Sequence, residues 1–287
     1  MYTLVDDTYR NKETNKELLV VSFSGGRTSA YMTQMLLEYY SEQYELLVIF
    51  ANTSREHEKT LEFINSCDQH LGFGTVWLEA QVNPQKGKGT KHVITSFSEA
   101  RRDGSVFEAV IAKYGIPNVS YLHCTRELKL QPMHSYLKSL GLDPVVVKTA
   151  IGIRADEPRR IGKKPNIVYP LFDWFPTIKE DILDYWQDEQ TFDLGLEDWE
   201  GNCISCYKKS DLKLGKVYAK YPSYFEWCAE MEAKYSHVGA PDAPRKMYRG
   251  SRSTTDMIKL FEHLGPDIKL QQKAHEDAGC SESCEVY

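Results

Sequence analysis

The chain has 287 residues, of which 41% are apolar and 26% charged, so a globular fold is expected and intrinsic disorder is excluded. At about 150 residues per domain, this length favours two domains or one large domain with additions. The formal net charge of −6 argues against an extensive nucleic-acid surface, although not against a local one, and no apolar stretch is long enough to span a membrane. We therefore expect a cytoplasmic protein without membrane contact.

The N-terminal half alternates short apolar runs with amphipathic segments. Continuous apolar strands separated by helices are typical of a parallel sheet that is covered on both faces. The sequence therefore predicts an α/β, Rossmann-like fold. The expected strands are 17–23, 45–53, 74–80 and 144–153, and the expected helices are 28–40, 58–71, 105–115 and 126–141.

Beyond about residue 170 the strand pattern ends and helical periodicity dominates. We accordingly predict an α/β domain over residues 1–170 and a mostly helical region over 171–287, which contains a CxxC segment and a polar C-terminal tail. The expected helices of this region are 177–187, 210–221, 222–235 and 253–265. One loop of the first domain is rich in basic residues, and we interpret it as a solvated loop: it contains Lys86, Lys88, Lys91 and His92.

The first apolar strand runs directly into the hexapeptide Ser-Gly-Gly-Arg-Thr-Ser and then into a helix. Paired glycines permit a tight turn, and the N–H groups at a helix N-terminus attract anions, so the pattern predicts a phosphate-binding loop. The alternative is a plain turn in which a hydroxyl caps the helix. The Walker pattern is absent. The residues expected to bind phosphate are Ser24, Gly25, Gly26, Arg27, Thr28 and Ser29.

This strand–SGGxxS–helix junction resembles the PP-loop of the N-type ATP pyrophosphatases, and within them the phosphoadenosine phosphosulfate (PAPS) reductase family. Four further segments carry the same resemblance: Phe50–Glu56, Cys124–Lys129, Gly152–Arg160 and Gly201–Lys209. The resemblance implies an adenine nucleotide alpha hydrolase-like sheet that binds ATP or PAPS.

By the same resemblance, Asn52 and Thr53 hold the adenosine, and Gly152 and Arg154 contact the anionic groups. Arg154 and Lys209 are the implied catalytic residues. Polar residues that follow parallel strands gather at one edge of the sheet, which agrees with this placement. Two carboxylates beside Arg154 are candidates for a magnesium ion or for pairing with arginines: Asp156 and Glu157.

Seven cysteines in a chain without an export signal are not expected to form a disulfide framework. Cys67 and Cys228 fall in helical patterns, and we interpret them as core thiols. Cys203 and Cys206 form a CxxC pair, which is a recurrent unit of zinc and iron–sulfur sites. Cys124 stands 79 residues before this pair.

The resemblance implies a [4Fe–4S] cluster held by Cys124, Cys203 and Cys206, with Cys280 or Cys284 as the fourth ligand or with one open iron. Zinc bound by the same thiols and a redox dithiol at the CxxC pair are the alternatives.

Three functions follow as hypotheses. The first is an ATP-dependent enzyme that adenylates an acceptor, releases pyrophosphate and inserts sulfur from a sulfur donor. The second is a PAPS or adenosine phosphosulfate reductase that releases sulfite and uses a thiol reductant. The third is a nucleotide-binding protein without turnover. A nucleic-acid acceptor is compatible with the sequence but is not indicated by the net charge, and the sequence predicts no oligomeric state.

Overall fold

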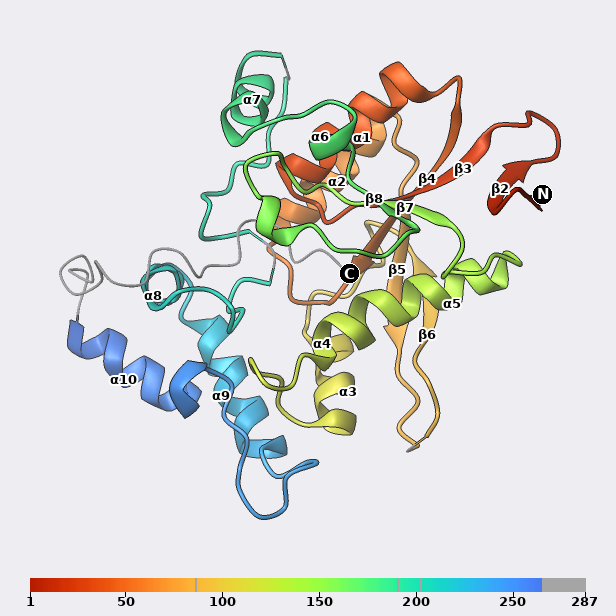
Figure 1. The fold of residues 1–287 in the computed structure, drawn as a ribbon. Coiled ribbons are helices and arrows are strands. Elements are labelled where there is room, and N and C mark those ends of the chain that lie inside the picture. Colours follow the sequence, from red (N-terminus) through yellow and green to blue (C-terminus); the bar gives the residue numbers. More distant parts are fainter. Residues whose placement is uncertain (86, 190, 202, 265–287) are drawn as a thin grey trace.

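The computed structural model describes residues 1–264 apart from 86, 190 and 202. A mixed sheet lies at its centre and helices flank it (Figure 1). The strands are β1 (Tyr2–Val5), β2 (Thr8–Asn11), β3 (Glu17–Ser22), β4 (Tyr44–Asn52), β5 (Val76–Gln81), β6 (Lys91–Thr95), β7 (Lys148–Ala150) and β8 (Ile167–Val168).

The strand order creates a crevice beside β3. This strand pairs in parallel with β4 on one side and with β7 on the other, while β5 extends the sheet beyond β4 and β8 extends it beyond β7. The chain thus leaves β3 in one direction and later returns to its other side. In open α/β sheets, ligands bind at such a reversal, outside the carboxyl ends of the strands. The structure places that point between the ends of β3 and β7.

Helices cover both faces of the sheet because the residues of β3 alternate between two apolar clusters. Leu19 and Val21 pack on the side of α1 and α2, whereas Leu18 and Val20 pack on the side of α5. The helices of this part are α1 (Arg27–Tyr40), α2 (Glu58–Leu71), α3 (Ser105–Tyr114), α4 (His123–Thr125), α5 (Gln131–Ser139), α6 (Pro170–Asp173) and α7 (Lys179–Asp184). The predicted α/β fold with helices on both faces is confirmed.

Several local expectations need correction. The strand predicted over 144–153 is reduced to β7, because the backbone carbonyl of Asp143 accepts hydrogen bonds from Val146 and Val147 and its carboxylate accepts one from Val145, which forms a turn. The helix predicted from residue 126 begins with a π-helical turn over Arg126–Leu130. The β1–β2 hairpin and the antiparallel edge strand β6 were not predicted, since their residues are mostly polar and only partly buried.

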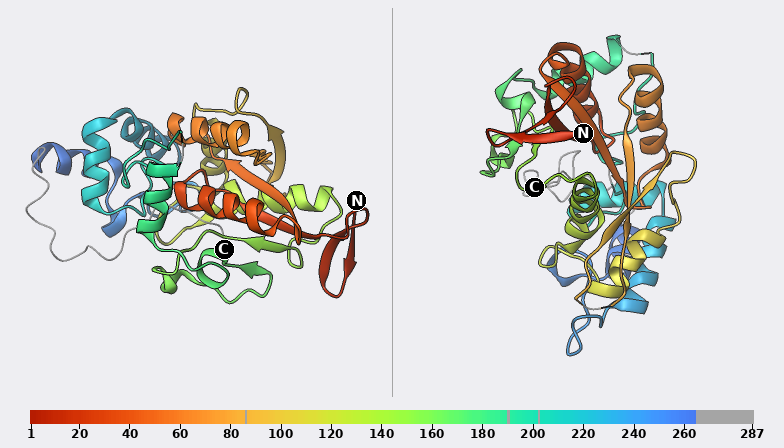
Figure 2. Two further views of the ribbon diagram at one scale, coloured as in Figure 1. Left: turned by 90° about the horizontal axis from the view of Figure 1, so that it is seen from above. Right: turned by 90° about the vertical axis from the view of Figure 1, so that its right-hand side faces the viewer.

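A second apolar cluster lies at the end of the molecule away from the N-terminal hairpin (Figure 2). It contains α8 (Asp211–Lys220), α9 (Ser223–Tyr235) and α10 (Thr254–Leu264), with Phe225 at its centre. The first cluster, by contrast, extends through α7 to Leu196. The domain boundary near residue 170 stays a prediction, although the packing favours a later division. None of the helices described combines the length and apolar character needed to cross a membrane.

A buried carboxylate joins the two clusters. Glu200 is 1% exposed and accepts hydrogen bonds from Lys220 at 2.6 Å and from the hydroxyl of Tyr221 at 2.7 Å. The same hydroxyl lies 3.2 Å from Nε2 of His57, directly before α2. Burial raises the pKa of Glu200, but the hydrogen bonds from Lys220, from the backbone of Glu197 and from Tyr221 outweigh burial and hold the pKa at about 2.

We predict that Glu200→Gln lowers the free energy of unfolding at neutral pH by about 1–2 kcal/mol, because the charge-assisted hydrogen bonds are lost and solvent screens part of the effect. A carboxylate with a lowered pKa stabilises the fold above its ordinary pKa and loses this contribution as pH falls. The free energies of unfolding of the unmodified protein and of Glu200→Gln should therefore differ by a constant amount above about pH 5 and by less toward pH 2. Urea titrations at a series of pH values measure this difference. A difference that grew on acidification would contradict a lowered pKa for Glu200.

Candidate functional site

The phosphate loop makes a turn that only glycine accommodates. Gly25 has φ +79°, and a Cβ atom placed on it would lie 2.7 Å from Cγ2 of Thr60 and 2.8 Å from Cδ1 of Ile64 in α2. Both distances are shorter than carbon atoms approach one another. The loop therefore packs directly against α2, and its backbone faces the crevice beside β3 without an intervening side chain.

The N-terminus of α1 offers donors to an anion. Gly26 is the N-cap, so it has no side chain that could cap the helix, and the first turn contains no acidic residue. The first N–H groups of a helix have no intrahelical acceptor. Ser24 and Ser29 hold the loop together, because their hydroxyls lie 2.9 Å apart and the N–H of Ser24 donates to the hydroxyl of Ser29. This arrangement is the one that binds phosphate in other α/β proteins.

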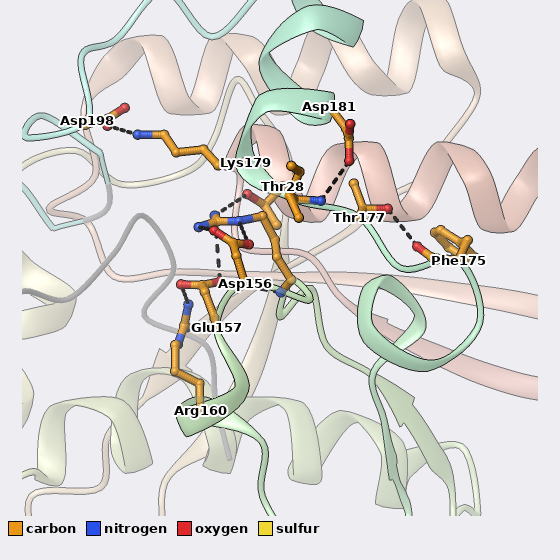
Figure 3. Close-up of polar contacts among 11 residues, drawn as sticks. Thr28, Asp156, Glu157, Arg160, Phe175, Thr177, Lys179, Asp181 and Asp198 are labelled. Carbon is orange, nitrogen blue, oxygen red and sulfur yellow. Dashed lines mark hydrogen bonds and ion pairs between the residues drawn. The ribbon is translucent and has the colours of Figure 1, made fainter.

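A guanidinium lies across the crevice from the loop. Arg154 follows β7, is 6% exposed, and donates from one terminal nitrogen to the hydroxyl of Thr28 at 3.5 Å. It also donates to both oxygens of Asp156, at 2.9 and 3.2 Å. Glu157 accepts a hydrogen bond from Arg160 at 2.7 Å (Figure 3). Each carboxylate is thus paired with an arginine, which is the alternative to magnesium binding that the sequence had left open. Gly152 is buried at the same end of the sheet.

Arg27 contacts the segment that follows α7, and phosphate binding by this residue stays a prediction. It donates to both oxygens of Asp193, at 2.6 and 2.5 Å, and to the carbonyl of Leu196 at 3.0 Å. Partial burial raises the pKa of Asp193, but the bonds from Arg27 outweigh burial and lower it. Arg27 therefore holds the 193–201 segment against the loop, where Leu194, Leu196, Glu197 and Gly201 enclose a cavity of about 10 Å³ with Ser24, Gly25, Gly26, Arg27 and Thr60.

The side chains at the carboxyl end of β4 form part of the site. Asn52 is fully buried and donates to Glu79 at 2.7 Å, so its side chain builds the sheet edge. Thr53 donates to Glu56 at 2.6 Å, and the same hydroxyl lies 3.6 Å from the sulfur of Cys203. Adenosine binding by Asn52 and Thr53 stays a prediction, but Thr53 links the nucleotide-binding edge to the cysteines.

Four thiols line one cavity of about 40 Å³. They are those of Cys124, Cys203, Cys206 and Cys228. No disulfide joins them to one another, and the N–H of Cys206 donates to the carbonyl of Cys203 at 3.1 Å, which closes the CxxC pair into a turn. Cys228, interpreted from the sequence as a core thiol, is 2% exposed, and burial raises its pKa. Only the tertiary structure brings its sulfur to this cavity.

Cations surround the thiol cavity. Arg55 lies 4.5 Å from the ring centroid of Tyr224 and 4.3 Å from that of Trp227, and Lys129 and Lys208 also line the cavity. Positive charge near a thiol favours the thiolate, which is the reactive form. Lys209, by contrast, is 5% exposed and donates to the carbonyls of Trp199 and Ile204 at 2.7 and 2.8 Å. These bonds position the CxxC turn, and the catalytic role implied for Lys209 stays a prediction.

The donor set does not fit a metal cluster within the part of the chain described. No group of three or more histidine, cysteine, aspartate or glutamate side chains is placed there to hold a metal ion. The sulfur of Cys124 lies 3.2 Å from the hydroxyl of Tyr207, and that of Cys203 contacts Thr53. Cys280 and Cys284 lie outside the described residues.

The phosphate loop and the thiol cavity are adjacent. Gly201 lines the cavity over the loop, and Cys203, two residues later, lines the thiol cavity. Glu200, held by Lys220, fixes the start of this short connection. The same stretch of chain therefore contributes to both cavities.

The sheet order, the glycine loop at its reversal and the arginine opposite define an α/β protein with a candidate phosphate site at the carboxyl end of its sheet. The family model of the phosphoadenosine phosphosulfate reductase domain matches residues 18–196, and the chain belongs to that family. The resemblance predicted from the sequence is therefore confirmed.

Three proteins that are similar to this chain are as follows. The nin region protein ORF290 of Escherichia phage lambda is 33% identical over 280 residues, which cover 93% of this chain and 94% of that protein. Protein MJ0066 of Methanocaldococcus jannaschii is 24% identical over 181 residues, covering 59% of this chain and 31% of that one. A PAPS reductase structure from Candida auris, solved as a phosphate complex, matches with a TM-score of 0.36 and 15% identity over 59% of this chain and 71% of that chain.

We predict that Gly25→Ala destabilises the fold by about 3 kcal/mol, because it combines a left-handed backbone with two overlapping contacts. Gly72→Ala is the matched control. Gly72 has φ +69° but no atom within 4 Å of the added carbon, so its cost should be near about 1 kcal/mol. Thermal and urea unfolding of both variants measure the difference, and equal losses would show that the loop does not pack on α2 as described.

Proposed function

We propose that the protein is an adenine-nucleotide enzyme that binds the nucleotide's phosphates at Ser24–Ser29 and transfers sulfur at the neighbouring thiols. The adjacency of the two cavities carries this proposal, because Gly201 lines one and Cys203 the other. A nucleotide-binding protein without turnover would have no use for a four-thiol cavity lined by cations beside its phosphate site.

The first reaction we propose is ATP-dependent sulfur transfer. An oxygen of the acceptor attacks the α-phosphorus of ATP, and pyrophosphate leaves. Arg154, placed opposite the loop, stabilises the charge that develops on the phosphate. The product of this step is an adenylated acceptor whose carbon is open to a sulfur nucleophile.

The CxxC turn supplies the second step. The terminal sulfur of a persulfide on Cys203 or Cys206, loaded by an external sulfur donor, attacks the activated carbon and expels AMP. The other thiolate then breaks the sulfur–sulfur bond, which leaves a thiocarbonyl product and a Cys203–Cys206 disulfide. An external thiol reductant returns the pair to its starting state. The turn that brings these two residues together supports this role.

A second candidate reaction is reduction of a sulfonucleotide, which the family match favours. Here a thiolate attacks the sulfur of PAPS or adenosine phosphosulfate, the adenine nucleotide leaves, and a thiol reductant releases sulfite from the resulting thiosulfonate. In the sequence resemblance the nucleophile of such enzymes lies in a C-terminal Glu-Cys-Gly-Leu-His segment. Neither Cys280 nor Cys284 stands in that pattern, so the ATP reaction remains our first candidate.

Gly26 offers a charge probe of the phosphate site. Its backbone, φ −100° and ψ 160°, suits any residue, and aspartate and asparagine are both good N-caps. We predict that Gly26→Asp abolishes binding of ATP and PAPS because its carboxylate repels phosphate, whereas Gly26→Asn retains more of the affinity. Isothermal titration of both variants with each nucleotide is the measurement. Equal affinities in the two variants would contradict phosphate binding at this loop.

The cysteine variants separate the two reactions. We predict that Cys203→Ala and Cys206→Ala each stop product formation while leaving nucleotide affinity unchanged, and that Cys67→Ala, a buried thiol of α2 away from the cavity, does not. The assay supplies radiolabelled ATP, PAPS and adenosine phosphosulfate in parallel. AMP and pyrophosphate formed only with an acceptor and a sulfur donor support the first reaction.

Sulfite release that depends on Cys280 or Cys284 would support the second reaction and contradict the first. Cleavage of no nucleotide under any condition would contradict both. Iron, sulfide and zinc analysis of anaerobically purified protein tests the cluster implied by the resemblance, since about four iron atoms and four sulfides per chain would show that the protein holds a [4Fe–4S] cluster.

A further inference from the structure

A group of cations and one exposed aromatic ring, that of Tyr121, surrounds α3, next to the thiol cavity. We call it the basic–aromatic surface. It consists of Lys88, Lys113, Tyr121, Arg126, Arg245 and Lys246, which come from four segments that are distant in the sequence. In Figure 1, α3 lies between α9 and the β5–β6 hairpin in the lower half of the molecule, where these segments meet.

Contacts around Tyr114 join these residues into one surface. The ring of Tyr114, at the end of α3, lies 5.0 Å from the ammonium of Lys113 and 5.6 Å from the guanidinium of Arg126. Arg245 donates to the carbonyl of Tyr114 at 2.7 Å and covers the ring of Tyr121 at 3.8 Å. Lys113 also donates to the carbonyl of residue 88, which ties the basic loop to α3 at 2.5 Å. Lys86 of that loop lies outside the described residues.

The surface carries positive charge that the chain does not neutralise. Among the ion pairs of the described residues, none involves Lys88, Lys113 or Arg245, although Arg126 pairs with buried Glu127 at 2.7 Å and Lys246 with Asp256 at 3.5 Å. Arg245 donates only to carbonyls, and its Nε is buried without a partner. These cations give a protein with a net charge of −6 a locally positive face.

A groove of about 690 Å³ runs along this surface. Its walls are the 118–121 loop and the 239–251 loop, and they include Tyr121, Arg245 and Lys246 together with one acid, Asp242. Tyr121 is 45% exposed, and Val119 and Leu122 beside it are 48% and 51% exposed.

The groove and the thiol cavity are neighbours along the chain. Met247 follows the basic residues of the groove and Cys124 follows its aromatic loop, and both line the thiol cavity.

We propose that this surface binds single-stranded nucleic acid, with phosphates held by the cations and bases stacked on Tyr121 and the apolar residues beside it. Cations along a groove together with exposed aromatic rings are the combination that single strands recognise, since every base offers a face for stacking. Binding of a strand to this surface does not depend on the function proposed above. That the bound strand is also the acceptor of sulfur transfer does depend on it, and this part of the proposal names the class of the acceptor.

The test is fluorescence anisotropy of the full chain with labelled RNA and DNA of about 12 nucleotides, single-stranded or as a duplex. We expect single strands to bind more tightly than duplexes of the same sequence, and the RNA and DNA arms show which sugar is preferred. Lys113→Ala with Arg126→Ala should weaken binding at least fivefold and reduce the slope of log affinity against log salt by about 0.7 for each lost phosphate contact. Tyr121→Ala should weaken binding while leaving the salt slope unchanged.

Lys12→Ala with Lys16→Ala, which removes two cations from the N-terminal hairpin far from α3, is the matched control and should bind as the unmodified protein does. ATP and PAPS titrations of every variant separate the two proposals. Nucleotide binding without strand binding would overturn the basic–aromatic surface and leave the enzyme proposal standing, and strand binding without nucleotide binding would do the reverse. The proposal would also be overturned if the control and the surface variant lost strand affinity equally, or if duplex and single strand bound with equal affinity.

Discussion

The backbone of Gly25 runs so close to Thr60 and Ile64 that no Cβ atom fits between the phosphate loop and α2. This close approach fixes the end of β3, the entry into α1 and the position of α2 relative to both. Since Gly26, the N-cap of α1, has no side chain that could cap the helix, no side-chain cap occupies the first N–H groups of α1. The phosphate loop, the arginine opposite it and the crevice all depend on this one steric condition.

A single segment transmits that geometry to the cysteines. Residues 193–206 begin at Asp193, which Arg27 holds against the loop, and end in the CxxC turn, which Lys209 holds through backbone carbonyls. Between them, Glu200 is anchored by Lys220 and Tyr221 of the helical part. Arg27, Glu200 and Lys209 thus each fix part of the connection between the phosphate loop and the thiols.

Positive charge is concentrated in two places although the chain as a whole is negatively charged. The excess of acidic residues coexists with cations that line the thiol cavity and with others that surround α3. Several of these cations, among them Arg55 and Arg245, lie over aromatic rings, which stabilise a positive charge without neutralising it. Such cations remain available to anionic groups, and a net charge alone does not reveal them.

The sequence by itself determined the α/β class, the phosphate loop and the family. Apolar periodicity, paired glycines and the short segments around Cys124, Arg154 and Cys203 are local patterns, and each reflects a local requirement of backbone or chemistry. Only the tertiary structure decided which side chains contact one another. Arg27 donates to Asp193, Asn52 donates to Glu79, and the thiol of Cys228 lines a cavity together with three distant cysteines. These outcomes depend on which side chains from remote segments meet after the sheet and helices pack, and no local pattern encodes such meetings.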